Sequence, residues 1–242
     1  ELKYFGTREQ GQSVLHDGQL TLTKNLNVPR IGPPLDADDT PRRDRLVVEY
    51  NTSTTPTFEG AVRDTSGRGL DGMFYGGASY DATEKALEFD GTDDYILTGN
   101  LGNSAGAYVN SGSFWIKADN MSANMIILQI GKGADVSTKR FQVNLETTGQ
   151  ITFGINGSNS RFQSGITTGS WFHFAYSYDG GVNGASSTSY KLYINGVSKS
   201  ISSGSGAATL NLDADAILVI GSDHLASGQF LDGAISQFKL YD

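Results

Sequence analysis

Short runs of alternating apolar and polar residues fill most of the chain after residue 45, separated by clusters of Gly, Asn, Asp and Ser. Alternation with a period of two is typical of half-buried β-strands, whereas an amphipathic helix needs a period near 3.6. No window of 12 residues keeps its apolar residues on one helical face. The pattern therefore predicts strands over 46–50, 86–90, 94–98, 112–118, 125–130, 140–146, 150–155, 171–178, 190–195, 216–220 and 233–241.

Two of the joints between these strands carry residues typical of β-hairpins. Asn195-Gly196 follows the run 191–194. Thr148-Gly149 separates 141–146 from 151–155. Many short strands joined by tight turns indicate antiparallel pairing in a sandwich or a barrel, and we favour an all-β, antiparallel two-sheet sandwich.

The first 45 residues follow a different pattern. Apolar residues at 20, 22, 26 and 28 predict a strand with one apolar face, which a single short strand cannot bury by itself. Four of the five prolines lie within 29–41, where they interrupt central strands and helices. We predict an extended arm at 1–28, a Pro-rich linker at 29–45 and one β domain at 46–242.

Composition narrows the functions that are open to the chain. Eighteen Lys and Arg against 26 Asp and Glu give a net charge of −8, which argues against nucleic acid as a partner. The absence of a long apolar run predicts no membrane insertion. Without Cys there is no disulfide, thiol nucleophile or thiolate metal site. No signal-peptide pattern follows Glu1, so we expect no targeting segment and a fragment of a longer protein.

Five segments resemble, in order and spacing, the laminin-G-like domains of the concanavalin A-like lectin/glucanase superfamily. They are 86–96 (ALEFDGTDDYI), 112–118 (GSFWIKA), 168–180 (TGSWFHFAYSYDG), 192–197 (LYINGV) and 230–242 (FLDGAISQFKLYD). Residues 46–50 and 64–67 also resemble that family's opening strand and first turn, so the resemblance covers about 46–242. It implies a two-sheet jelly roll, within which the ligand varies widely.

The segment 17–28 is similar to the short repeats of phage and viral fibre stems, in which three chains wrap together. This resemblance implies a homotrimer, since partner chains would bury the apolar face of the strand. An arm that packs on its own domain or on a neighbouring subunit is equally open.

The sequence gives only weak evidence for a set of catalytic residues. Glucanases of the superfamily carry Glu-x-Asp-x-x-Glu on one strand, and the nearest match here, 88–93, ends in Asp and falls where laminin-G-like domains have a turn. His173 lies inside an apolar strand where the family also has histidine, so we expect a structural, hydrogen-bonded role. We predict no catalytic residues and a protein that is not an enzyme.

A sugar site pairs an aromatic ring face with polar groups for the hydroxyls. Trp115 and Trp171 fall at core positions of the family, so we expect both to pack inside. Loop residues, including those of the Gly-rich segment 72–81 and the polar segment 156–161, are the better candidates. The predicted ligand-binding residues are Tyr75, Tyr80, Tyr108, Asn156, Asn159, Arg161, Phe162, Asp223 and His224.

Calcium is a candidate cofactor, because many relatives hold one and because it takes six to eight oxygens from flexible loops. No set of ligands can be assigned, since no acidic residues fall in an EF-hand register. The Asp residues in or beside loops are Asp64, Asp71, Asp93, Asp94, Asp135, Asp179 and Asp223.

Three functions follow from these observations. The first is a non-enzymatic binding module for a glycan or glycoprotein receptor, displayed outside the cell or on a virion, as part of a phage or viral fibre. The second is an assembly module that contacts neighbouring structural subunits. The third is a glycan-cleaving enzyme, which needs two carboxyl groups about 5–9.5 Å apart in one cleft. Exposed, grouped candidate rings would favour the first function, and scattered or buried rings the second.

Overall fold

The structure is a computed structural model, which describes residues 13–16, 19–22, 45–54, 57–58, 60–103, 105–132, 138–155, 158–163, 165–181, 188–200, 203–204, 209–223 and 228–242. The chain divides into two units, Glu1–Arg42 and Arg43–Asp242. The described residues form strands and turns and no α-helix. Within them, accordingly, no helix has the length and apolar character needed to span a membrane.

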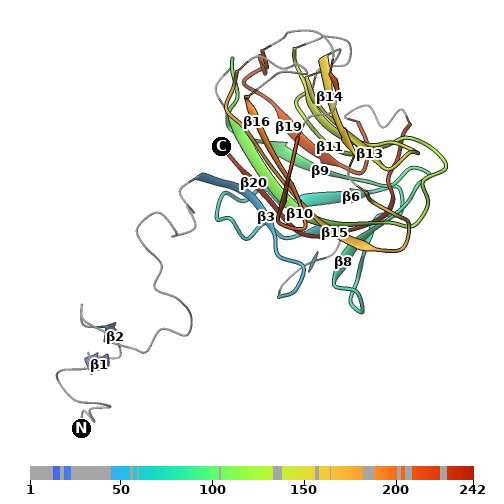
Figure 1. Ribbon diagram of the computed structural model, residues 1–242. Helices are drawn as coiled ribbons and strands as arrows, with labels where there is room; N and C mark the ends of the chain where they lie inside the picture. Colours follow the sequence, from blue (N-terminus) through green and yellow to red (C-terminus); the bar gives the residue numbers. More distant parts are fainter. Residues whose placement is uncertain are drawn as a thin grey trace. The chain divides into compact units, whose positions relative to one another are not determined.

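The unit Arg43–Asp242 is a sandwich of two antiparallel sheets (Figure 1). The eight-stranded sheet has the order β17-β16-β15-β10-β20-β8-β7, with β3 also paired to β20. Its strands are β3 (Leu46–Tyr50), β7 (Ser79–Asp81), β8 (Ala86–Asp90), β10 (Asn110–Ala118), β15 (Trp171–Tyr178), β16 (Tyr190–Ile194), β17 (Val197–Lys199) and β20 (Asp232–Tyr241).

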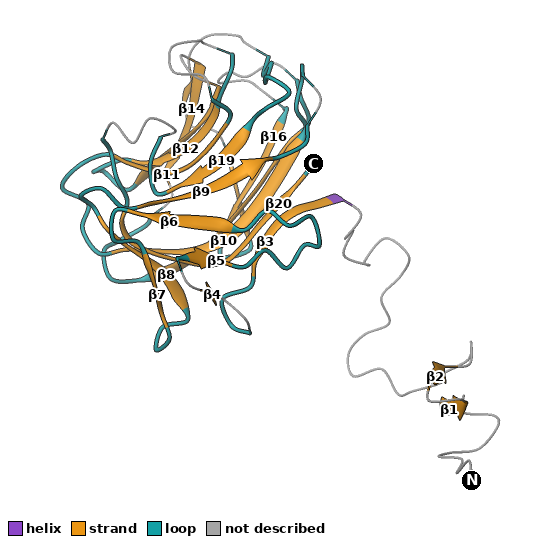
Figure 2. Cartoon of the chain, turned by 180° about the vertical axis from the view of Figure 1, so that it is seen from behind, coloured by secondary structure: helices purple, strands orange, loops and turns teal. Residues whose placement is uncertain are grey.

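The ten-stranded sheet has the order β18-β14-β13-β12-β11-β19-β9-β6-β5-β4 and lies nearest the viewer in Figure 2. Its strands are β4 (Thr57–Phe58), β5 (Ala61–Val62), β6 (Gly72–Tyr75), β9 (Tyr95–Asn100), β11 (Met125–Ile130), β12 (Phe141–Leu145), β13 (Gln150–Ile155), β14 (Ser158–Gln163), β18 (Ser203–Gly204) and β19 (Ile217–Ile220).

The hydrophobic core lies between the two sheets, because each strand turns alternate side chains inward. On β10, Phe114 and Ile116 are fully buried while Trp115 between them is exposed. The Phe141 ring packs against Tyr176, with the ring centroids 5.3 Å apart, as part of a cluster of aromatic rings inside the sandwich. The expected all-β jelly-roll sandwich is therefore confirmed.

The strands predicted from alternation are present, with bounds within two residues of those expected. Both hairpins are confirmed. Ile194 pairs with Val197 across Asn195-Gly196, whose φ values of 50° and 75° fit the two-residue turn that this dipeptide favours. The second hairpin joins β12 to β13 through a turn that contains Gly149, with a φ of 72°.

Two segments predicted to be loops are strands instead. The Gly-rich segment 72–81 contains β6 and β7, and the polar segment 156–161 runs into β14. Gly72 serves close packing rather than a turn, because a Cβ there would lie 2.5 Å from the Ile96 side chain. Pairing with the neighbouring strands decides these elements, since strand preference depends on context more than on local composition.

The unit Glu1–Arg42 contains a hairpin of β1 (Ser13–His16) and β2 (Gln19–Leu22), in which His16 pairs with Gln19. The single apolar-faced strand expected from residue 20 onward is thus paired over its described part. Residues 23–44, with most of the predicted linker, lie outside the described residues. The domain bounds and the trimer stay predictions.

Candidate functional site

A hollow of about 260 Å³ opens on the outer face of the ten-stranded sheet. The alternation of β12 builds its floor, because Phe141, Val143 and Leu145 fill the core while Gln142 and Asn144 point outward. The residues that line the hollow are Asn124, Arg140, Gln142, Asn144, Glu146, Thr152 and Gln229.

Hydrogen bonds hold the amide groups of this floor in fixed orientations. Gln142 Nε2 donates to Gln129 Oε1 at 2.9 Å, and Gln129 Nε2 donates to the Gly131 carbonyl at 2.9 Å. Asn144 Nδ2 donates to Thr152 Oγ1 at 3.3 Å. Asn144 Oδ1 is buried and accepts no hydrogen bond from the part of the chain that the structure describes. A buried oxygen in this state needs a hydrogen-bond partner that the described residues do not supply.

The charges of the hollow are one cation, Arg140, and one carboxylate, Glu146, among the described lining residues. Burial lowers the pKa of the Arg140 guanidinium, and the Asp223 carboxylate opposes this shift. The balanced charges and amides suit a neutral ligand with many hydroxyls. The two carboxyl groups that glycoside hydrolysis requires are not both present among these lining residues.

Three residues predicted for ligand binding lie beside this hollow. The Asp223 carboxylate raises the pKa of Arg140, which lines the hollow. Arg161 on β14 is the register partner of Thr152, and Asn159 pairs two residues further along the same ladder. Asn156 and His224, also predicted, lie outside the described residues.

The candidate aromatic rings are not brought together. Tyr75, on β6, is 41% exposed and stacks on Tyr95 with a centroid distance of 4.7 Å. Tyr80 is half-buried on β7 of the other sheet, and Tyr108 is buried in the core. Phe162 is on β14, far along the sheet order from β6. Scattered rings are what the assembly hypothesis expects, so a glycan site has to use other groups.

The prediction that Trp115 packs in the core is wrong. Its side chain is 41% exposed, because β10 places it on the outward side of the eight-stranded sheet, and its ring lies 5.2 Å from the His173 ring. Trp171 is half-buried, with Lys117 Nζ 5.6 Å from its ring centroid. Partial burial lowers the pKa of His173, whose backbone N–H donates to Asn195 Oδ1 at 2.8 Å.

The acidic residues considered for calcium are largely engaged by the backbone. Asp90, Asp93 and Asp94 bring carboxylate oxygens within 4.8 Å of one another. Asp94 accepts hydrogen bonds from the backbone N–H groups of Asp90 and Gly77, which ties two turns together. Calcium stays a prediction.

The other calcium candidates do not join this group. Asp71 accepts the backbone N–H of Asp64 at 2.7 Å, so these two form a separate pair. Asp179 is exposed, and Asp223 lies beside the hollow. Asp135 lies outside the described residues.

We expect the Asp94 carboxyl to titrate above its ordinary pKa of 3.8, because burial disfavours its charged form. Since the pKa of Asp94 is higher in the folded state than in the unfolded chain, the folded protein binds more protons at pH values between these two pKa values. Stability from this group therefore increases as the pH falls through the raised pKa. Carboxyl-detected NMR titration should place Asp94 above Asp81, whose pKa the N–H of Thr83 lowers; the reverse order would contradict the burial argument.

Comparisons with known proteins agree with this architecture. A laminin-G-type family model, described as the concanavalin A-like lectin/glucanases superfamily, matches residues 90–242. No curated protein matches the chain.

Two solved structures illustrate the likeness. Domain 4 of AbnA, an extracellular GH43 arabinanase from Geobacillus stearothermophilus, was solved in complex with arabinotriose; it is 21% identical with a TM-score of 0.58, over 82% of this chain and 92% of that one. The binding domain of botulinum neurotoxin serotype D is 17% identical with a TM-score of 0.55. This match covers 82% of this chain and 48% of the toxin domain, about half of its length. At these identities the likeness shows the fold.

Proposed function

Because the chain belongs to the concanavalin A-like lectin/glucanases superfamily, we propose that it is a carbohydrate-binding domain whose ligand site is the hollow on the ten-stranded sheet. The observation that carries this proposal is the floor of ordered amides, in which Asn144 Oδ1 is buried without a described partner. Sugar hydroxyls both donate and accept hydrogen bonds, so they complement amide side chains of this kind.

The size and chemistry of the hollow favour a short, neutral saccharide. Pockets for small ligands usually measure about 300–1,000 Å³, so a volume of about 260 Å³ suits one or two sugar residues. Gln142, Asn144 and Thr152 would bind hydroxyls from the floor, while Arg140 and Glu146 would do so from the rim. The arabinotriose bound to the related arabinanase domain supports a neutral sugar as the ligand class.

The wider context that we propose is display outside the cell on a stem formed by the unit Glu1–Arg42. The resemblance of segment 17–28 to fibre repeats supports this proposal, as does the β1–β2 hairpin, a small element that association with other chains would stabilise. Static light scattering on the full chain measures the association: a mass of three chains supports the stem, and a single-chain mass opposes it.

Replacing Asn144 with alanine should weaken binding of neutral oligosaccharides about tenfold, because the ligand loses a buried hydrogen-bond partner. Calorimetry with arabinotriose, preceded by a glycan array, measures the effect on the folded chain. Asn100→Ala is the matched control, since it removes an exposed amide of the same sheet outside the hollow. Absence of neutral-sugar binding by the wild type, or equal losses in both variants, would contradict the proposal.

A further inference from the structure

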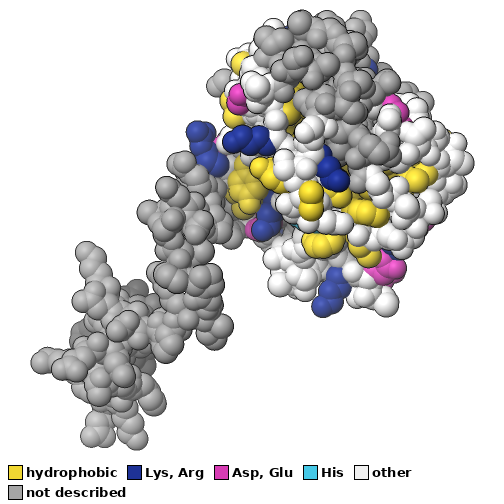
Figure 3. All heavy atoms as spheres, viewed as in Figure 1, with side chains coloured by type: hydrophobic (Ala, Val, Ile, Leu, Met, Phe, Trp, Pro, Cys, Tyr) yellow, Lys and Arg dark blue, Asp and Glu magenta, His cyan; other side chains and the backbone are white. Residues whose placement is uncertain are grey.

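The outer face of the eight-stranded sheet carries exposed rings and lysines on strands that lie side by side. We call it the lysine–aromatic face. Figure 3 shows hydrophobic side chains on this side of the domain, with Lys and Arg side chains around them. The face consists of Lys191 and Tyr193 on β16, His173 and Ala175 on β15, Ser113 and Trp115 on β10, and Lys239 on β20.

The strand register aligns four of these residues in one row across the sheet. Tyr193 pairs with Ala175, Ala175 with Ser113, and Ser113 with Lys239. Neighbouring strands are about 4.8 Å apart, so the row extends about 14 Å, the length of a short oligosaccharide. Trp115, two residues from Ser113 on the same strand, lies on the same side of the sheet.

Two rings stand beside short side chains on this face. Tyr193 is 37% exposed and Trp115 is 41% exposed, whereas the residues between them in the register are Ser113 and Ala175. Short side chains leave the sides of the rings open to a ligand. The His173 ring, 5.2 Å from Trp115, holds the indole on one side. Apolar C–H faces of sugar rings bind against aromatic rings presented in this way.

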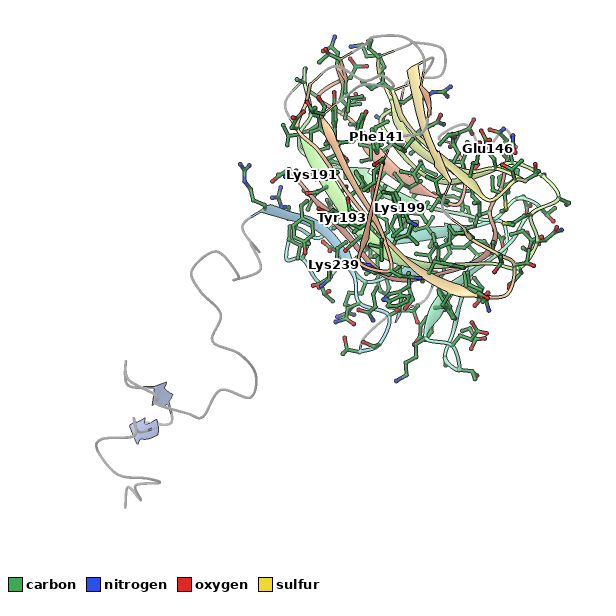
Figure 4. The ribbon with its side chains drawn as sticks, in the orientation of Figure 1. Phe141, Glu146, Lys191, Tyr193, Lys199 and Lys239 are labelled. Carbon is green, nitrogen blue, oxygen red and sulfur yellow. The ribbon has the colours of Figure 1, made fainter. Side chains whose placement is uncertain are left out.

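The charge of the face is the reverse of that of the whole protein, whose net charge is −8. Figure 4 shows Lys191 and Lys239 on either side of Tyr193. Within the described ranges, Lys191 takes part in no ion pair with a carboxylate. Lys239 Nζ lies 3.5 Å from Glu49 Oε1, and the Glu49 side chain is only 9% exposed. The cations thus outnumber the accessible carboxylates here.

We propose that the lysine–aromatic face is a second binding site, for a saccharide chain that carries carboxylate or sulfate groups. Sugar rings stack on Tyr193 and Trp115, and the anionic substituents bind the lysines. Anions without rings would use the lysines alone and leave both exposed aromatic side chains without a partner. The site is independent of the hollow, because the two lie on the outer faces of different sheets.

The test is calorimetry of the full chain with a sulfated hexasaccharide, a galacturonate hexasaccharide, neutral maltohexaose and a poly-glutamate peptide. We expect binding of at least one anionic hexasaccharide, weakened by raising the salt from about 50 to about 500 mM, and weaker binding of maltohexaose. The sulfated and galacturonate arms identify the anionic group. No binding of either anionic sugar, or equal or tighter binding of poly-glutamate, would overturn the proposal, the latter in favour of an acidic protein partner.

Paired variants locate the site on this face. Tyr193→Ala should weaken binding of the anionic hexasaccharide about tenfold, and Lys191→Gln about threefold. The controls Tyr75→Ala and Lys132→Gln make the same changes elsewhere, at an exposed ring and at an exposed lysine. Equal losses in test and control variants would overturn the assignment.

The hollow provides a separate readout. Asn144→Ala should leave anionic-sugar binding unchanged, and Tyr193→Ala should leave arabinotriose binding unchanged. Failure of one site is therefore distinguishable from failure of the other. Loss of both activities in either single variant would oppose two independent sites.

Discussion

The Phe141→Ala variant is expected to lose about 3–5 kcal/mol of the free energy of unfolding, the range for removing a fully buried phenylalanine ring. The Phe141 ring has no exposed surface and packs against Tyr176, Tyr178 and Tyr190, with centroid distances of 5.3, 6.1 and 6.4 Å. These tyrosines belong to the eight-stranded sheet and Phe141 to the other. The cavity left by the substitution would therefore lie between the two layers of the sandwich.

Urea denaturation followed by tyrosine and tryptophan fluorescence measures this loss. Val197→Ala is the control, because Val197 is 60% exposed and should change stability by less than about 0.5 kcal/mol. If the two variants unfolded at the same urea concentration, the aromatic cluster would not stabilise the domain as the packing indicates.

Asp64→Ala is expected to destabilise the domain by about 2–4 kcal/mol, since hydrogen bonds to a charged acceptor contribute more than neutral ones. Asp64 Oδ1 accepts the backbone N–H of Glu49 at 3.0 Å and of Ser66 at 2.9 Å. Oδ2 accepts the Ser66 hydroxyl at 2.7 Å and the Leu70 N–H at 3.0 Å. One carboxylate therefore ties the turn 64–70 to strand β3.

The control for this variant is Asp213→Ala, which removes an exposed carboxylate paired with Lys139 at 2.5 Å. Surface pairs of this kind contribute at most about 1 kcal/mol. Thermal unfolding by circular dichroism should show the larger shift for Asp64→Ala. A shift equal to that of the control would show that water replaces the four hydrogen bonds at little cost.

The strands were predictable where local alternation and pairing agree. Strand β12 has Phe141, Val143 and Leu145 on its buried side, and the sequence alone predicts a strand there. Strands β6 and β14 were missed, because their Gly and polar residues resemble loops until a neighbouring strand supplies the hydrogen bonds. Local composition does not contain that information.

The candidate sites were less predictable, because they depend on register between distant segments. The outward positions of Gln142 and Asn144 follow from alternation, but their meeting with Gln229 depends on how the strands pair. The sequence search considered loop aromatics and therefore missed the outer faces of strands. For Trp115, the alternation of β10 was the better signal, and the family position was the misleading one.

The sheet orders also bear on how copies of the domain would contact one another. Among the described strands, those at the ends of the two sheet orders, β17, β7, β18 and β4, have only two or three residues each. Short edges offer few free backbone groups to a neighbouring molecule, which hinders the edge-to-edge growth that leads to aggregation. The short edge strands would therefore not pair between neighbouring copies. Contacts between copies would have to use the broad outer faces of the sheets.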